Sequence, residues 1–335
     1  MSVFLYIIRR VASALAVIAV IAMAMFLIFF MTPTNPAQLM CGKPCTPERL
    51  AQVSAFMGTD LPWYSQLFNY LQGIFVGRTF GDSASASAIV CAAPCLGWSF
   101  ALNEPVTGLI FSRFPVTASI AIGAAVLWMI IGVFSGVLQA VKRDSWIDRL
   151  IVAISSIGIS SPTYLIGLLA IIAFAVYIPV FPTGGYVSFF ANPFDWAWHL
   201  LLAWIVLALI NGAFYARITR STMIREFGKD YVRTARAKGM PDSHVVVNHA
   251  LRNAILPIFT MFGLDLGGLL GGAVITERVF SMHGLGSLLL DAVKTFDLQV
   301  LVGVTLFSAA LVIIANLIVD VCYCLLDPRA AKVAL

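Results

Sequence analysis

Charged residues are scarce in this sequence. Lysine, arginine, aspartate and glutamate make up 11% of the 335 residues, whereas apolar residues make up 60%. Soluble globular domains carry about 25% charged residues, so this balance is far from theirs. Several apolar runs exceed the roughly 18 to 20 residues that a helix needs to cross a bilayer. Strands of a membrane barrel would alternate in character and be about half as long, so the composition predicts an all-α, polytopic membrane protein.

Motifs for chemistry are missing as well. No G-x4-G-K-[ST] phosphate loop is present, because the Gly-Lys pairs at Gly42 and Gly228 lack its context, so the chain cannot hold ATP in that way. No H-E-x-x-H or G-x-S-x-G motif occurs either. The four histidines are scattered, and His244 and His249 are five residues apart, off one face of an α-helix. We therefore predict a non-catalytic chain that binds no metal and no cofactor of its own.

Six apolar runs divide the chain into three regions. Residues 1–31 hold the N-terminus and a first span, which is too long for the apolar part of a signal peptide and is followed by no cleavage motif. Residues 32–113 form a long segment outside the membrane, and residues 114–335 hold the other five spans. The six predicted spans are residues 11–31, 114–141, 150–176, 196–215, 255–275 and 300–326.

Basic residues are divided unevenly between the two sides of these spans. Fifteen lie at the termini and in the even-numbered connections, and six lie on the other side, so the positive-inside rule places both termini in the cytoplasm. Because they are split among membrane-edge loops, the net charge of +5 does not indicate a nucleic-acid surface. The fifteen are Arg9, Arg10, Lys142, Arg143, Arg149, Arg217, Arg220, Arg225, Lys229, Arg233, Arg236, Lys238, Arg252, Arg329 and Lys332, and the six are Lys43, Arg49, Arg78, Arg113, Arg278 and Lys294.

The longest polar interval in the second half of the chain, residues 226–257, lies on the cytoplasmic side in this topology. Residues 230–238 are predicted to form a short helix, with an aspartate near its positive end and a lysine near its negative end. Gly239 stands where a helix takes a left-handed cap, and Pro241 prevents continuation. A second helix is expected to start with residue 242 or 243 as its N-cap and to run to about residue 254. Together these features predict a rigid elbow at the membrane surface.

The same interval resembles a known family. YVRTARAKG followed by HALRNAILP resembles the cytoplasmic coupling loop of permeases of ATP-binding-cassette (ABC) importers, in their peptide/nickel branch. The general pattern of this family is Glu-Ala-Ala, three residues and Gly, which here falls on Arg233, Thr234, Ala235 and Gly239. The glutamate is absent and the gap to Leu256 and Pro257 is long, and both departures are familiar in the peptide branch. LIFSRFPVTASI, KRDSWIDRL, VFSMHGLGSLLLDAV and LLDPR also match, so the resemblance covers nearly the whole chain except the segment near residues 91–95.

The resemblance implies a type I ABC importer permease with six transmembrane helices, in the inner or plasma membrane. It implies three kinds of partner: a second, similar permease, two ATPase subunits that carry ATP and Mg²⁺, and an extracytoplasmic solute-binding protein. The substrate it implies is a di- or oligopeptide, with nickel chelates or haem left open. The coupling loop, residues 216–254, would insert its short helix into a cleft on an ATPase subunit. The residues expected to couple are Asp230, Tyr231, Val232, Arg233, Ala235, Arg236, Lys238 and Gly239.

The fifth predicted span carries small residues at a spacing of four, namely Gly263, Gly267 and Gly271, which lets helix backbones touch. These glycines either pack within the chain or, as the family pattern implies, also face a partner subunit around a central path. Asp265 stands among them, where an ionisable group costs several kcal/mol unless it is paired or hydrated. Asp265 therefore either lines the translocation path or is a hydrogen-bonded packing residue. Asp320, in the last span, has a structural role in our interpretation.

Two further features lie in the segment before the second span. Cys41 and Cys45 form one C-x3-C pattern and Cys91 and Cys95 another, and disulfides, a thiolate metal site or free thiols are all open, with three possible pairings. Residues 61–77 have helical periodicity, which predicts a helix that lies against the membrane face or packs on other spans.

Two functions from other classes compete with a permease. An ion-coupled secondary transporter would use a proton or sodium gradient and would be expected to contain inverted repeats, which the sequence does not display. A membrane enzyme would need a catalytic constellation, and the sequence supplies none.

Overall fold

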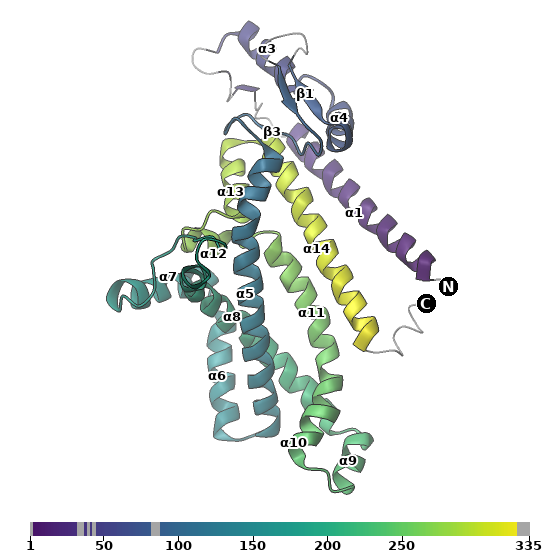
Figure 1. Cartoon of the computed structure of the whole chain (residues 1–335), viewed down its shortest axis with the longest axis vertical. Helices are drawn as coiled ribbons and strands as arrows, with labels where there is room; N and C mark the ends of the chain where they lie inside the picture. The colour runs from purple at the N-terminus through teal and green to yellow at the C-terminus, as the bar shows by residue number, and fades with distance from the viewer. Residues whose placement is uncertain (1–2, 32–36, 39–40, 42–44, 82–87, 327–335) are drawn as a thin grey trace. The chain divides into compact units, whose positions relative to one another are not determined.

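The computed structural model describes residues 3–31, 37–38, 41, 45–81 and 88–326, and it is mostly helical (Figure 1). The chain forms two compact units. The first unit comprises Met1–Pro115 and Gly284–Leu311, and the second comprises Val116–His283 and Val312–Leu335. Two long helices, α5 (Val106–Val141) and α14 (Leu298–Leu326), contribute residues to both units.

The first unit combines apolar helices with two short hairpins. Its helices are α1 (Val3–Met31), α3 (Pro47–Met57), α4 (Trp63–Val76) and α13 (Leu285–Thr295). Strand β1 (Arg78–Phe80) pairs antiparallel with β2 (Ile89–Cys91), with Thr79 opposite Val90, and β3 (Trp98–Ser99) pairs antiparallel with β4 (Glu104–Pro105). The helix α3 is bounded by local signals, since Thr46 caps its start and Gly58, at φ 71°, ends it.

Two apolar clusters hold the first unit together. One joins α5 to α13 and α14 through Ile110, Leu285 and Val304. The other joins α4 to α1 and α14, and in it Phe26 and Tyr70 meet edge to face with ring centroids 5.5 Å apart. The packing of α4 on other apolar helices confirms one of the two arrangements expected for residues 61–77.

Each of the two C-x3-C patterns forms a disulfide within itself. Cys41 bonds to Cys45 and Cys91 bonds to Cys95, with Cα atoms 5.4 and 5.6 Å apart. Among the three pairings that the sequence allowed, the structure therefore has the one that joins nearest neighbours. Cys91 and Cys95 lie buried beside Phe80 in a small cluster of their own.

The second unit consists of helices. It contains part of α5 and α14, together with α6 (Trp146–Ser160), α7 (Thr163–Ile171), the π-helix η1 (Ile172–Tyr177), α8 (Pro193–Phe227), α9 (Asp230–Ala237), α10 (Asp242–His244), the π-helix η2 (Val245–Leu251), α11 (Arg252–Leu270) and α12 (Val274–Val279). Its core lies where α5 meets α8, around the fully buried Trp128 and Leu200. Gly132 and Gly136 let these two helices approach closely, because a Cβ atom at Gly136 would lie 2.6 Å from the backbone oxygen of Ala216.

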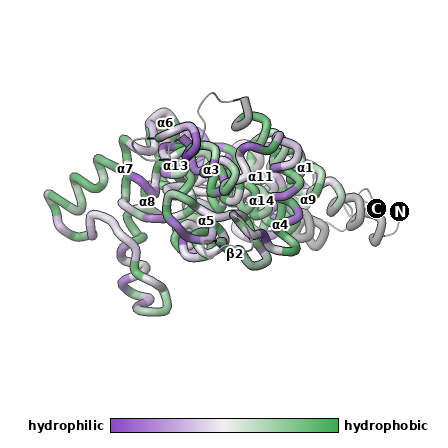
Figure 2. Tube along the Cα trace, turned by 90° about the horizontal axis from the view of Figure 1, so that it is seen from above, coloured by the Kyte–Doolittle hydropathy of each residue, from purple (hydrophilic) through white to green (hydrophobic). Residues whose placement is uncertain are grey.

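Four helices in the described residues are long and apolar enough to span a membrane: 106–141, 193–227, 242–270 and 298–319. A fifth span results if α6 and the α7–η1 segment count as one, but they are bent by 104°. The third predicted span, residues 150–176, is therefore divided between two helices that meet at a bend. Pro162 explains the break, because it lacks an N–H group and keeps Ser161 extended, at ψ 134°. Figure 2 shows the apolar character of α7 in green.

The remaining spans differ from the sequence prediction mainly in length. The helix α1 covers the first predicted span, and its described side chains, over residues 12–28, are apolar except for Ser13. The fourth span is longer than expected, because α8 continues to Phe227. The fifth ends five residues early, at Leu270, because Gly272 takes φ 131° and turns the chain. The side chain of Asp320 lies outside the described residues.

Candidate functional site

The predicted elbow is present at the end of α8. The short helix α9 matches the predicted residues 230–238 to within one residue. Gly239 has φ 76° and its N–H donates to the oxygen of Arg236 at 2.9 Å, which confirms the left-handed cap. A Cβ atom at this position would meet nothing within 4 Å, so the backbone conformation alone, and no close neighbour, favours glycine here.

The start of the second helix differs from the prediction. Pro241 is the N-cap residue, in place of residue 242 or 243, and no side chain caps the helix. Proline suits the position because its fixed φ, here −62°, leads into a helix. The helix then runs without interruption through η2 into α11, with Pro257 inside it, so residues 242–270 form one apolar helix. The elbow is thus rigidly continuous with a candidate span.

Tyr231 joins three helices at the elbow. Its hydroxyl donates to the Glu226 carboxylate at the end of α8 and accepts from Asn253 Nδ2, on α11, at 3.0 Å. Glu226 is 9% exposed and also accepts from Lys229 Nζ at 2.7 Å. Burial, together with the hydrogen bond to Glu226, raises the pKa of Tyr231, which keeps its hydroxyl protonated as a donor. We call Glu226, Tyr231 and Asn253 the elbow tether.

The inner face of α9 is apolar and closed. Val232 is fully buried and Ala235 is 5% exposed, and both pack with Val245 of η2 and Phe227 of α8. Val232 therefore has no surface with which to contact another protein in this conformation. The predicted coupling residues that remain exposed on the elbow are Asp230, Tyr231, Arg233, Arg236, Lys238 and Gly239.

The exposed arginines of α9 differ in how closely they contact other residues of the chain. Arg236 pairs with Asp242 at 3.4 Å across the turn and lies over the Phe227 ring, 5.6 Å from its centroid. Arg233 reaches Asp230 only at 3.9 Å, and both side chains are highly exposed. Such exposed pairs contribute little to stability, so the charge of Arg233 is available to a partner.

The histidine pair corrects another expectation. A spacing of five predicts that His244 and His249 lie off one face of an α-helix, but their rings lie 5.8 Å apart, edge to face. The reason is the π-helix η2, in which residues five apart are neighbours. Asn248 Nδ2 lies 2.8 Å from His244 Nδ1. Within the described part of the chain, no three His, Cys, Asp or Glu residues are grouped so that they could hold a metal ion.

A further contact, which we call the brace, ties the start of α6, and with it the loop after α5, to α8. Arg220 contacts Asp148 through two hydrogen bonds, Nε to Oδ1 at 2.9 Å and an Nη atom to Oδ2 at 2.8 Å. Asp148 is 3% exposed and also accepts from the backbone N–H of Asp144. Bidentate, buried pairs of this kind fix geometry well. The brace and the elbow tether therefore hold the loop after α5 and the elbow to the same end of α8.

The polar residue of the glycine-rich helix is hydrogen-bonded. The Tyr215 hydroxyl, on α8, donates to Asp265 Oδ2 at 2.7 Å, and Asp265 is half-buried. This contact matches the packing role considered for Asp265. Because its carboxylate is also partly exposed, a role of Asp265 at the translocation path is taken up below as a proposal.

The glycines of α11 pack within the chain. A Cβ atom at Gly263 would lie 2.2 Å from the Val319 side chain, and one at Gly267 would lie 3.1 Å from Val312 Cα. Both glycines therefore allow α11 to touch α14. Gly271 instead ends α11, and its N–H donates to the oxygen of Gly267 at 3.1 Å. A Cβ atom at Gly268 would meet nothing within 4 Å.

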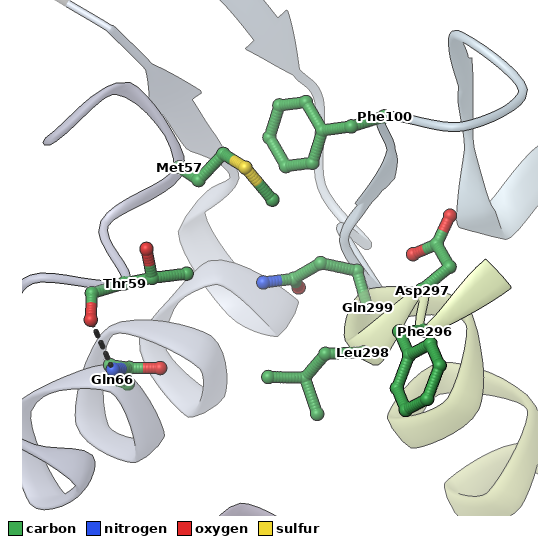
Figure 3. A pocket seen from close by; sticks show the side chains of 8 residues that line it. All are labelled: Met57, Thr59, Gln66, Phe100, Phe296, Asp297, Leu298 and Gln299. Atoms are coloured by element: carbon green, nitrogen blue, oxygen red, sulfur yellow. Dashed lines mark hydrogen bonds between the residues drawn. The ribbon is translucent and has the colours of Figure 1, made fainter. Parts of the chain in front are cut away.

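The first unit contains a cavity that has no room for a peptide, and Figure 3 shows the side chains that line it. Its volume is about 20 Å³, room for about one water molecule. Gln66 Nε2 donates to the backbone oxygen of Thr59 at 3.5 Å in its wall. The lining residues are Met57, Thr59, Gln66, Phe100, Phe296, Asp297, Leu298 and Gln299.

The elbow tether and the brace could not be predicted from the sequence, because each contains a contact between residues that are distant in the chain. Tyr231 and Asn253 are separated by 22 positions, and Asp148 and Arg220 by 72. The sequence indicates that these polar residues lie at the membrane edge, but no local pattern indicates which of them form pairs.

Comparison with known proteins identifies the family. Residues 129–332 match the family described as binding-protein-dependent transport system inner membrane component, and residues 3–121 match its N-terminal family. A putative peptide transport system permease protein of Brucella abortus is 36% identical over 323 residues, covering 96% of this chain and 98% of that protein. The glutathione transport system permease protein GsiC of Escherichia coli is 34% identical, covering 96% and 97%.

A solved structure agrees on the fold. The inward-facing MetNI methionine ABC transporter contains a chain with a TM-score of 0.51 and 19% identity, and the match covers 69% of this chain and 99% of that one. Helical architecture, apolar spans and similarity along nearly the whole length therefore agree. This chain belongs to the family of binding-protein-dependent transport system inner membrane components, and it is a permease subunit of an ABC importer of the peptide/nickel branch.

Proposed function

We propose that this permease carries di- or oligopeptides across the membrane and that its elbow transmits the conformational change of an ATPase subunit. The observation that carries the coupling role is the elbow tether, in which Tyr231 fixes α9 to the ends of α8 and α11. A push on the exposed face of α9 would then move two spans together. The peptide substrate is supported by the similarity to a putative peptide transport permease and a glutathione transport permease.

The proposed topology has six transmembrane helices: α1, α5, the bent α6–α7 pair, α8, α11 and α14. Both termini and the elbow face the cytoplasm, and the segment between α1 and α5 lies on the extracytoplasmic side. The fifteen-to-six division of basic residues supports this orientation.

The proposed complex contains a second permease, two ATPase subunits that bind ATP and Mg²⁺, and an extracytoplasmic solute-binding protein. ATP favours the closed ATPase pair, and closure favours the outward-open spans, so the work comes from differential binding of two states. Arg233 and Lys238, exposed on the outer side of α9, supply polar contacts to the ATPase cleft. Asp265 contributes a polar group to the path while Tyr215 holds its orientation.

Reconstitution tests this function directly. The purified permease pair, ATPases and binding protein are placed in proteoliposomes, and uptake of labelled di- and oligopeptides is measured with and without ATP. We expect uptake that requires ATP and the binding protein, with nickel chelates and haem as competitors that fail to reduce it. Uptake driven by a proton or sodium gradient without an ATPase would overturn the proposal in favour of a secondary transporter. Uptake of nickel chelates or haem alone would overturn the peptide substrate.

A further inference from the structure

The helix α4 has apolar residues on two of its faces. One face, with Leu67, Tyr70 and Ile74, packs on α1 and the start of α14. A second stripe follows helical spacing and is open: Tyr64 is 61% exposed, Phe68 67% and Phe75 82%. Ser65, Gln66 and Asn69 occupy a third, polar side, so α4 is amphipathic with a wide apolar side, a pattern typical of helices that lie at a membrane surface.

The partners of α4 show its depth. Its packed face contacts residues of α1 from Ile18 to Phe26, and α1 continues to Met31. At 1.5 Å per residue, Phe26 and Ile18 lie about 8 and 20 Å before the end of that helix. The contact thus lies alongside the apolar run of α1 rather than beyond its end. If α1 spans the membrane, as proposed above, α4 lies beside it at the depth of one leaflet.

The charge pattern agrees with this depth. No residue from 61 to 77 is charged, and the nearest charged residues, Asp60 and Arg78, stand just outside the two ends of the helix. Gln72 is the polar residue of the open stripe. At the N-terminal end, the Trp63 and Tyr64 rings lie 6.0 Å apart, and such residues are enriched where a membrane meets water.

We propose that α4 lies in the membrane leaflet at the C-terminal end of α1 and contacts lipid acyl chains through Phe68 and Phe75. Lipid fits the stripe better than a soluble partner does. A binding protein that docks and leaves would return several large apolar side chains to water in each cycle, and soluble surfaces rarely tolerate such patches. Lipid covers the stripe permanently. The helix then anchors the segment between α1 and α5 to the membrane.

Spin labels on single cysteines test this proposal in the complete transporter, in nanodiscs. The variants are Phe68→Cys and Phe75→Cys, with Gln52→Cys on the exposed side of α3 as the water-facing control, all in a background with Cys322 and Cys324 replaced by alanine. Accessibility to oxygen, which concentrates in lipid, is compared with accessibility to a water-soluble nickel chelate. We expect a several-fold higher ratio of oxygen to nickel accessibility at positions 68 and 75 than at position 52.

Two outcomes would overturn the proposal. Equal ratios at all three positions would place α4 in water, and shielding from both reagents at positions 68 and 75 would show that protein covers the stripe. The measurement is repeated with and without the solute-binding protein, which separates a permanent protein cover from a transient one. The readout is independent of the substrate, so failure of peptide uptake leaves it interpretable, and a failure of α1 to span would appear as water access along α1 itself.

Discussion

Removal of one hydroxyl group tests the elbow tether. Tyr231→Phe deletes the hydrogen bonds to Glu226 and from Asn253 while keeping the ring. A hydrogen bond to a charged group contributes about 1.5–3 kcal/mol, and a neutral one contributes about 1 kcal/mol. Because Tyr231 is 37% exposed, water replaces part of this loss, and we expect α9 to be held more weakly by about 1–2 kcal/mol. A loss of 1.4 kcal/mol shifts the balance between attached and detached α9 about tenfold.

The assay compares peptide uptake with ATP hydrolysis in proteoliposomes. Tyr231→Phe is expected to lower the number of peptides imported per ATP, because ATPase closure then moves α9 without moving α8 and α11. Membrane insertion and complex assembly should be unchanged. Tyr177→Phe, at a tyrosine that is 80% exposed, is the matched control. Equal coupling ratios in the two variants would refute the reasoning.

The pH dependence of Tyr231 provides an independent check. Burial and Glu226 raise the pKa of Tyr231 above its ordinary value of about 10. The neutral hydroxyl is the donor, so its contribution is complete below about pH 10 and is lost as pH rises through the raised pKa. The difference between wild-type and Tyr231→Phe absorbance titrations should thus show one tyrosine that ionises above pH 10. An ordinary titration midpoint would contradict the tether.

Three further changes test other parts of the structure. Gly136→Ala should separate α5 from α8 and destabilise the permease by about 1–3 kcal/mol in thermal unfolding, whereas Gly268→Ala, where a Cβ meets open space, should be close to neutral. Asp265→Asn keeps an oxygen that can accept from Tyr215, so stability should hold, while loss of uptake would mark a path role and normal uptake a packing role. Burial raises the pKa of Asp297, so the stability of the first unit should fall as pH rises from about 4 through that pKa. In unfolding scans, Asp297→Asn should make the stability depend less on pH. A pH profile that the substitution leaves unchanged would contradict the raised pKa.

The sequence predicted what local patterns encode. Apolar runs located the spans, and a glycine at residue 239 beside Pro241 located the elbow, because left-handed caps and missing N–H groups act within a few residues. The break at Pro162 was also encoded locally, but the long apolar run on both sides dominated the interpretation. Hydropathy reports burial in lipid and carries no information on helix direction.

Other features depend on contacts that no local pattern encodes. The pairing of Tyr215 with Asp265 joins different helices 50 residues apart. The π-helix that brings His244 to His249 depends on one extra residue per turn, which the 3.6-residue period cannot reveal. The closed inner face of α9 likewise arises from the packing of Val232 on Val245, so its residues were expected at an interface but lie in the interior of the elbow.

The central claim is that α9 is the surface on which an ATPase subunit acts. The most direct measurement places a photo-crosslinking residue at Lys238, on the exposed side of the elbow, in the assembled transporter. We expect a crosslink to the ATPase subunit, with a yield that changes when ATP closes the ATPase pair. A crosslink to the solute-binding protein, or no crosslink to the ATPase in any nucleotide state, would contradict it.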